Sequence, residues 1–291
     1  MVNSNLRIGT CSWKYDSWRG LVYSEQKPLN YLQEYSRHYR TVEIDQWFWS
    51  LFGVEKVTLP SPFTVQEYLE SVPPDFMFTI KVPNSLTLSH FYQKVKSEPL
   101  VENPYFLSPV LFQDFLRSIE PLKKNLGPLM FQFEYLNKQK MPSQKIFQEK
   151  FAHFIREADP DYYYAVEIRN PNYLNRQYFE FLQSHGLSHV FLQGYYMLPV
   201  VDIYHSFRDY LRKRVVIRLH GPDRADIEKR SGGKWDQIVN SRDQELNQIA
   251  GIIKELLDRK FEVYVNVNNH YEGSAPLSIK RLEKFLSSSD V

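Results

Sequence analysis

Hydrophobic positions in this chain follow two alternating patterns from one end to the other. Short runs rich in β-branched and aromatic residues, typical of strands, are separated by longer segments in which apolar residues recur every three or four positions, as in amphipathic helices. The pattern predicts eight strands, at Leu6–Cys11, Thr41–Asp45, Met77–Val82, Leu129–Glu134, Tyr163–Arg169, Ser188–Gln193, Arg214–His220 and Glu262–Val267. The predicted helices include Ser108–Lys124, Ser143–Glu157, Gln177–His185 and Gln244–Arg259.

This order of elements indicates a fold class. Strands that alternate with helices are typical of parallel sheets joined by helical crossovers. Eight such units predict an α/β fold, a TIM-like (β/α)8 parallel barrel, with a doubly wound open sheet as the alternative. No repeat, low-complexity tract or linker divides the 291 residues, so we expect one domain over 1–291.

Three connections that follow predicted strands are long: Pro83–Asn103, Gly194–Phe207 and Gly221–Asp236. In a barrel, the segments after the C-terminal ends of the strands build the functional face. Loops of this length are frequently lids or binding loops, with Gly232 and Gly233 as a hinge, although an ordinary surface excursion explains any one of them equally well.

The composition narrows the partners and the compartment. No run of about 18 apolar residues is present, which argues against a membrane partner. Lys and Arg total 36 against 34 Asp and Glu, and the formal charge of +2 gives no overall attraction to nucleic acid. The only cysteine, Cys11, cannot form an internal disulfide, and the polar N-terminus lacks a signal-peptide pattern, so we expect a cytoplasmic protein. An isolated cysteine of this kind is a weak candidate for a nucleophile.

Polar residues recur on one face of the predicted strands, close to their C-terminal ends. Alternate residues of a strand share a face, and the apolar residues between them would face the surrounding helices. We therefore expect the polar groups to converge in one pocket at the C-terminal mouth of the barrel, with a purely structural ion network as the alternative. The pairs are Glu43 and Asp45, Thr79 and Lys81, Gln132 and Glu134, Glu167 and Arg169, Arg218 and His220, and Asn266 and Asn268, followed by His270.

The charges of this predicted pocket are nearly balanced, four carboxylates against three cations. Guanidinium groups beside carboxylates suit recognition of phosphate or carboxylate, so we expect a small oxyanion on Arg169 or Arg218. The alternative is that both arginines only neutralise the neighbouring carboxylates. We expect Glu43 or Glu167 to be the general acid or base, assisted by His220 and His270. The predicted substrate-binding residues are Lys81, Gln132, Arg169, Arg218, Asn266, Asn268, Trp13 and Trp47.

No cofactor is assigned by a motif. HExxH and CxxC are absent from the sequence, and no metal site is expected, with convergence of His220 and His270 on Glu43 or Glu167 as the alternative. A glycine-rich dinucleotide fingerprint and a P-loop are absent as well, which argues against a nucleotide cofactor.

Four of the five tryptophans follow the first two predicted strands: Trp13, Trp18, Trp47 and Trp49. Flat rings beside polar groups can stack on a sugar or a nucleobase, although tryptophans more often cover a hydrophobic core.

Ordered blocks along the chain resemble the YecE-like family, also called domain of unknown function 72. They include Ile8–Trp13, Thr41–Asp45, Lys81–Pro83, Val166–Pro171, Arg218–Gly221 and Asn268–Pro276. The resemblance implies a TIM-like barrel and brings no established reaction or cofactor. The chain departs from the family at Asp45, where Asn is more frequent, at Ser12, where Gly is more frequent, and at Phe133–Glu134, where a proline-containing segment is common.

Three functions fit these observations. The first is an enzyme that acts on a small anionic molecule, such as a phosphorylated sugar or nucleotide fragment, by acid–base chemistry. The second is a nucleic-acid-binding or repair-associated protein that stacks bases on the tryptophans, whose binding would weaken steeply with salt. The third is a non-catalytic interaction scaffold, in which alanine substitutions at the mouth would lower stability without changing a ligand's affinity. The oligomeric state does not follow from the sequence.

Overall fold

The computed structural model describes residues 4–53, 56–93, 95 and 97–288. Eight strands pair in parallel and close into a barrel in the order β1, β2, β5, β6, β7, β8, β9, β10 and back to β1. This confirms the predicted TIM-like (β/α)8 barrel and excludes the open sheet. The barrel strands are β1 (Leu6–Thr10), β2 (Thr41–Ile44), β5 (Met77–Lys81), β6 (Leu126–Phe133), β7 (Tyr164–Ile168), β8 (Ser188–Gly194), β9 (Arg214–Gly221) and β10 (Glu262–Val267).

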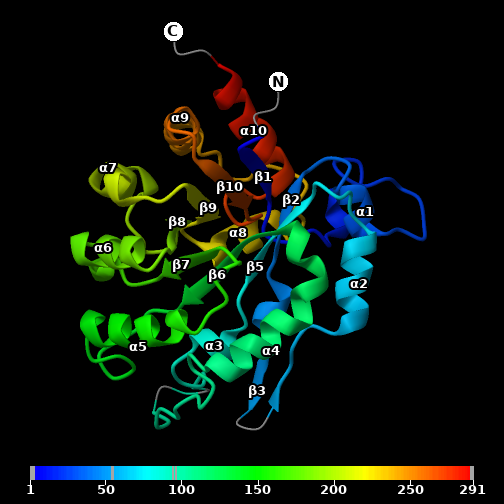
Figure 1. The fold of residues 1–291 in the computed structure, drawn as a ribbon. Coiled ribbons are helices and arrows are strands. Elements are labelled where there is room, and N and C mark those ends of the chain that lie inside the picture. The colour runs from blue at the N-terminus through cyan, green and yellow to red at the C-terminus, as the bar shows by residue number, and fades with distance from the viewer. Residues whose placement is uncertain (1–3, 54–55, 94, 96, 289–291) are drawn as a thin grey trace.

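Helices follow every barrel strand and form a ring around the barrel (Figure 1). Local sequence sets where several of them begin: the side chains of Ser108, Ser143 and Asn175 each accept a hydrogen bond from a backbone N–H three residues on. No helix in the described part of the chain is both long and apolar enough to cross a membrane. The ring helices are α1 (Tyr31–Tyr35), α2 (Pro62–Glu70), α4 (Pro109–Ile119), α5 (Gln144–Arg156), α6 (Arg176–Ser184), α7 (Val200–Phe207), α9 (Asp243–Asp258) and α10 (Ala275–Ser287).

The long connections contain structure that hydrophobic periodicity does not reveal. The segment Pro83–Asn103 holds α3 (Asn84–Thr87), and Gly221–Asp236 holds α8 (Arg224–Ser231), while α7 begins within Gly194–Phe207. Residues 94 and 96 of the first segment lie outside the described residues. A two-stranded hairpin of β3 (Leu51–Gly53) and β4 (Lys56–Val57) follows β2. Short 3-10 turns occur at η1 (Asp16–Trp18), η2 (Gln46–Phe48), η3 (Glu120–Asn125), η4 (Pro171–Tyr173) and η5 (Arg208–Tyr210).

The start of β6 differs from the prediction. The strand begins at Leu126, three residues before the predicted Leu129. Gly127 and Pro128 read as a turn, but they lie within the strand, where the register with β5 shifts between Phe78 and Ile80. Such an irregularity accommodates a proline that cannot donate to the sheet.

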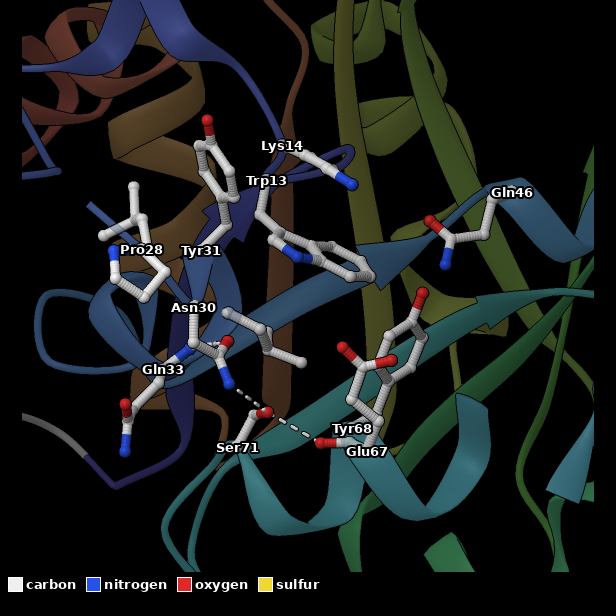
Figure 2. A pocket seen from close by; sticks show the side chains of 12 residues that line it. Trp13, Lys14, Pro28, Asn30, Tyr31, Gln33, Gln46, Glu67, Tyr68 and Ser71 are labelled. Carbon is white, nitrogen blue, oxygen red and sulfur yellow. Dashed lines mark hydrogen bonds between the residues drawn. The ribbon is translucent and has the colours of Figure 1, made fainter. Parts of the chain in front are cut away.

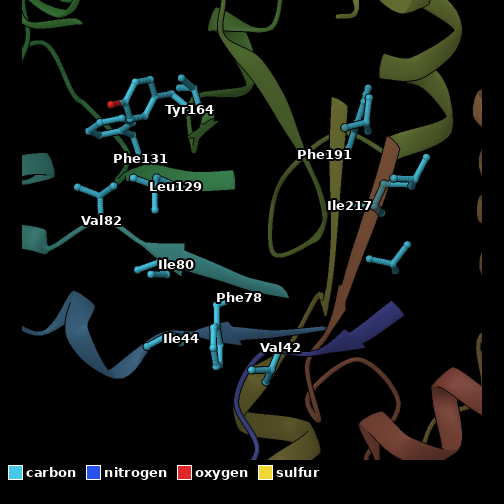
Figure 3. Close-up of a cluster of buried hydrophobic side chains, with 14 of the residues drawn as sticks. Val42, Ile44, Phe78, Ile80, Val82, Leu129, Phe131, Tyr164, Phe191 and Ile217 are labelled. Atoms are coloured by element: carbon cyan, nitrogen blue, oxygen red, sulfur yellow. The ribbon is translucent and has the colours of Figure 1, made fainter. Parts of the chain in front are cut away.

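Apolar side chains fill two separate spaces. Alternate residues of neighbouring strands pack outwards under the helices, as the side chains of Val42, Ile80 and Ile217 illustrate (Figure 3). Inside the barrel, a small apolar cluster is closed off from that outer core, because the strands stand between them. Its members are Met130, Ala165, Val190, Val216 and Tyr264, with Met77 packed against them. The inward-facing residues closer to the C-terminal mouth are polar, so this cluster forms the floor of the site.

A close approach between β1 and β2 requires a glycine at position 9. A Cβ atom on Gly9 would lie 2.0 Å from the carbonyl oxygen of Thr41.

Gly9→Ala should therefore lower the free energy of unfolding by about 2 kcal/mol or more, because β1 and β2 must separate. Urea unfolding checks this. The matched control is Gly251→Ala in α9, where nothing lies within 4 Å of the added Cβ and helix propensity favours a gain of about 0.5 to 1 kcal/mol. Equal effects of both substitutions would contradict the closure argument.

Candidate functional site at the mouth of the barrel

The guanidinium group of Arg218 occupies the centre of the barrel above the apolar floor. Its Nε and Nη2 donate to the two carboxylate oxygens of Glu43, at 2.8 and 2.6 Å. Its Nη1 donates to Glu167 and, at 3.2 Å, to Gln132. All three charged side chains are at most 2% exposed. Strands β2, β6, β7 and β9 are thus tied together through one side chain.

A second set of neutral groups completes this network. The Nδ2 of Asn266 donates to Glu43 at 3.1 Å and to the hydroxyl of Thr79 at 3.0 Å. The Oδ1 of Asn266 is buried and has no hydrogen-bond partner in the part of the chain that the structure describes. A buried carbonyl oxygen without a donor is costly. The Oδ1 of Asn266 is therefore suited to accept a hydrogen bond from a bound molecule.

Arg169 lies beside the network and is more exposed. Its Nε donates to Glu167 at 2.9 Å, and its side chain is 23% exposed. Its guanidinium carbon lies 4.8 Å from the centre of the Tyr195 ring, a cation–π contact. Within the described residues, neither Nη group of Arg169 has a hydrogen-bond acceptor. Glu167 and Tyr195 therefore hold the guanidinium plane while its outer edge remains open.

His220 connects Tyr195 to the buried thiol of Cys11. Its Nδ1 lies 3.2 Å from the Tyr195 hydroxyl, and its Nε2 lies 3.6 Å from the sulfur. Burial, followed by the charge of Arg218, lowers the pKa of His220 well below its usual range, so the imidazole is neutral. Burial, followed by Glu43, raises the pKa of Cys11. The Cys11 thiol is therefore protonated at neutral pH.

The position of Tyr195 could not be inferred from the sequence, since it lies in the loop after β8. Its backbone amide donates to the carbonyl of Gly221 at 2.9 Å, which brings the loop against the end of β9. A Cβ atom on Gly194 would lie 2.3 Å from that same carbonyl oxygen, and Gly194 has φ 140°. Only glycine permits this approach, and this approach places Tyr195 over His220.

Lys81 and Asp45 face the network without joining it. The Nζ of Lys81 lies 3.8 Å from the centre of the Phe48 ring, and the residue is 8% exposed. Burial and then Arg218 lower the pKa of Lys81 to about 8. Burial and then Glu43 raise the pKa of Asp45 to about 6. Both groups thus titrate far closer to neutral pH than an ordinary lysine or aspartate does.

The two catalytic glutamates expected from the sequence, Glu43 and Glu167, are both ion-paired with Arg218. Burial alone would raise the pKa of Glu167, but Arg218, Arg169 and Lys81 lower it to about 2. Among the described residues, no group of three or more His, Cys, Asp and Glu side chains is arranged to hold a metal ion.

Other predicted site residues lie at the edge of the mouth or outside it. His270 contacts Asn268 through its Nδ1 (2.5 Å) and Glu228 through its Nε2 (3.1 Å), and its ring packs on Trp235. Neither His270 nor Asn268 joins the Arg218 network. Glu134 binds Lys140 at 2.7 Å. The structure thus brings the inner polar residues into contact around Arg218, and it places these outer residues in separate contacts.

The tryptophans after the first two strands mostly cover the core. Trp13, Trp18 and Trp47 are at most 9% exposed, whereas Trp49 is 59% exposed. The rings of Trp13 and Trp47 both pack on Tyr68, at centroid distances of 5.2 and 5.5 Å.

Trp13 also lines a groove of about 690 Å³ that runs between α1 and α2 (Figure 2). Lys14, Gln46 and Tyr68 line the same groove. The sequence places Trp13 and Gln46 just after β1 and β2, but among the described residues the contacts of Trp13 are with Tyr68 and Tyr23 and not with the Arg218 network.

Fold and site together define a (β/α)8 barrel protein with an arginine–carboxylate network buried under its C-terminal mouth. The family described as "Protein of unknown function DUF72" matches residues 7–290, and the chain belongs to this family. A DUF72 family protein from Thermotoga maritima is 25% identical, with a TM-score of 0.67, over 97% of this chain and 99% of that one. A DUF72 family protein from Enterococcus faecalis is 21% identical, with a TM-score of 0.67, over 98% and 97%. No curated protein matches the chain.

Removing the central guanidinium should destabilise the barrel. Arg218→Met leaves Glu43 buried without a counterion and leaves Glu167 with Arg169 alone, which costs about 3 to 5 kcal/mol. The triple variant Arg218→Met/Glu43→Gln/Glu167→Gln should recover part of that loss, because neither carboxylate is then left in the core without the Arg218 guanidinium. Urea unfolding measures both effects, with Arg176→Met, whose side chain is 76% exposed, as the control. A stable single variant would show that the network is dispensable.

The ionised carboxylate of Asp45 should lower the free energy of unfolding at neutral pH. Its pKa is about 6 in the folded protein against 3.8 for the free side chain, so the folded state binds the proton more tightly. The cost is absent below pH 3.8, grows as the pH rises through 6, and reaches at most ~3 kcal/mol. Asp45→Asn should therefore stabilise the protein at pH 7 by about 1 to 3 kcal/mol and have little effect near pH 3.8. The control is Asp75→Asn, which removes only an exposed ion pair with Arg40. A stabilisation independent of pH would contradict the assignment.

Proposed function

We propose that the protein is an enzyme that binds a small anionic molecule at the C-terminal mouth of the barrel and transfers protons on it. The observation that carries this proposal is the guanidinium of Arg169, whose Nε is held by Glu167 while neither Nη group has an acceptor among the described residues. A planar fork held in this way matches the two oxygens of a carboxylate or phosphate. Arg218 is less suited to this role, since its donors are already occupied by Glu43, Glu167 and Gln132.

Lys81 and Asp45 are the best candidates for the proton transfers. An acid or base works best when its pKa is near the working pH, and the pKa values of about 8 and 6 meet that condition. Glu43 and Glu167, the acid or base expected from the sequence, are better suited to positioning Arg218 and Arg169.

His220 and Asn266 supply further polar contacts in this proposal. His220, neutral and hydrogen-bonded to Tyr195, would pass a proton between the mouth and Tyr195. The unused Oδ1 of Asn266 would accept a hydrogen bond from a hydroxyl of the bound molecule. His270 and Asn268 would order the loop after β10 at the rim.

An anion-binding measurement tests this proposal. Isothermal titration calorimetry with inorganic phosphate and with glycolate should detect binding to the wild type. Arg169→Gln should weaken the affinity by roughly 10- to 150-fold, because a hydrogen bond to a charged group contributes about 1.5 to 3 kcal/mol. Arg169→Lys should also weaken binding, since it keeps the charge and loses the fork.

Arg176→Gln, which removes an exposed arginine paired within α6, is the control and should bind like the wild type. Failure of both anions to bind the wild type would overturn the proposed substrate class. Equal affinities of the wild type and Arg169→Gln would remove Arg169 from the site.

A second candidate function rests on exposed aromatic side chains around the mouth. Trp49 lies 6.5 Å from Tyr92, and Tyr135 lies 6.3 Å from Tyr196, as ring-centroid distances. All four are at least 50% exposed. Such rings can stack unpaired bases, so this rim favours binding of single-stranded nucleic acid. Affinity for an oligonucleotide that falls steeply with salt would favour this candidate over the first.

A further inference from the structure

Lys81 is a nearly buried amine that the structure leaves without a fixed polar partner. It ends β5 on the inner face of the barrel, and its Nζ lies over the Phe48 ring, 3.8 Å from the ring centre. Within the described residues, no carboxylate and no carbonyl accepts a hydrogen bond from this Nζ. Lys140 at the rim of the same mouth is different, because its Nζ binds Glu134 at 2.7 Å.

The glutamates that could pair with Lys81 in a structural ion network already bind arginine side chains. Glu43 uses both oxygens on Arg218, and Glu167 divides its oxygens between Arg218 and Arg169. The charged groups that act on Lys81 are Arg218 from β9, Glu43 and Asp45 from the end of β2, and Glu167 from β7. Burial and the positive charge of Arg218 favour the neutral amine, and a buried cation without a partner is costly. A neutral lysine side chain is a nucleophile.

We propose that the Nζ of Lys81 attacks the carbonyl carbon of an aldehyde or ketone carried by the anionic molecule, and forms an iminium. This inference rests on the proposed function, because Arg169 would hold the anionic group of that molecule. The substrate class is thereby narrowed from small anions to anions with a reactive carbonyl group.

The atoms of this step balance without an outside reagent. The lone pair of the neutral amine forms the C–N bond, the carbonyl oxygen takes a proton, and the nitrogen releases one, which gives a neutral carbinolamine. Asp45 in its acid form donates a proton to the hydroxyl, and the C–O bond breaks to release water and leave the cationic iminium. The Phe48 ring under the nitrogen stabilises that cation. The Asp45 carboxylate is then positioned as a base for the acidified C–H beside the iminium carbon.

Reductive trapping tests the proposal. The protein at pH 7 is treated with glyoxylate and sodium cyanoborohydride, which reduces an iminium to a stable carboxymethyl-amine, and peptide mass spectrometry locates the label. At pH 7 roughly one in ten amines with a pKa of about 8 is unprotonated, against about one in 2,500 for an ordinary lysine. Lys81 should therefore be labelled at least ten times faster than Lys145, whose side chain is 77% exposed, and glycolate should slow the labelling of Lys81 alone.

The variants separate this inference from the proposed function. Lys81→Met should lose the label, and the wild-type measurement stands by itself if that variant does not fold. Binding of glycolate to the wild type with no excess label on Lys81 would overturn the iminium and leave the anion site intact. Excess label on Lys81 that is unchanged in Arg169→Gln would support the nucleophile and overturn the role of Arg169. Labelling of Lys81 no faster than Lys145 overturns the inference in every case.

Discussion

The bidentate pair between Arg218 and Glu43, buried in the centre of the barrel, is the interaction on which the rest of the site depends. Transfer of a single charge into this interior would be strongly unfavourable, so the guanidinium can remain there only with both Glu43 and Glu167 in place. Replacement of such a network by apolar residues is often neutral or stabilising in other proteins. In this barrel the network orients the side chains of the site, because it joins residues from four strands at fixed distances.

The ion pairs of Arg218 determine the state of the charged groups beside them. Two carboxylates are taken by Arg218, and one of them also orients Arg169 through its Nε. Among the residues that the structure describes, Lys81 and Asp45 form no ion pair, and their pKa values move towards neutrality from opposite sides. The unpaired amine, the unpaired acid and the open guanidinium edge are therefore consequences of one buried ion network. Perturbed titratable groups that gather in this way are typical of functional sites.

The groove between α1 and α2 illustrates why volume alone does not locate the chemistry. It is large, at about 690 Å³, and Trp13 lines it, but none of the groups of the Arg218 network does. The polar side chains of the central mouth instead bind one another around Arg218.

Sequence patterning by itself determined the barrel and the inner face of its strands. Residues two apart in a strand share a face, so pairs such as Glu167 and Arg169 could be assigned to the mouth from their spacing. Local signals also placed the starts of helices at Ser108 and Ser143. The beginning of β6 was missed, since Gly127 and Pro128 carry the signal of a turn and only pairing with β5 makes them a strand.

Tertiary structure alone decided which charged groups are paired and which are free. Alternation places Arg218 and Lys81 on the same inner face, but it carries no information about which of them reaches Glu43, because that depends on the tilt and stagger of strands far apart in sequence. The same is true of Tyr195, which lies over His220 only because Gly194 and Gly221 allow two loops to approach. Periodicity is a local property of the chain, whereas ion pairing and burial in a closed barrel depend on contacts between distant segments.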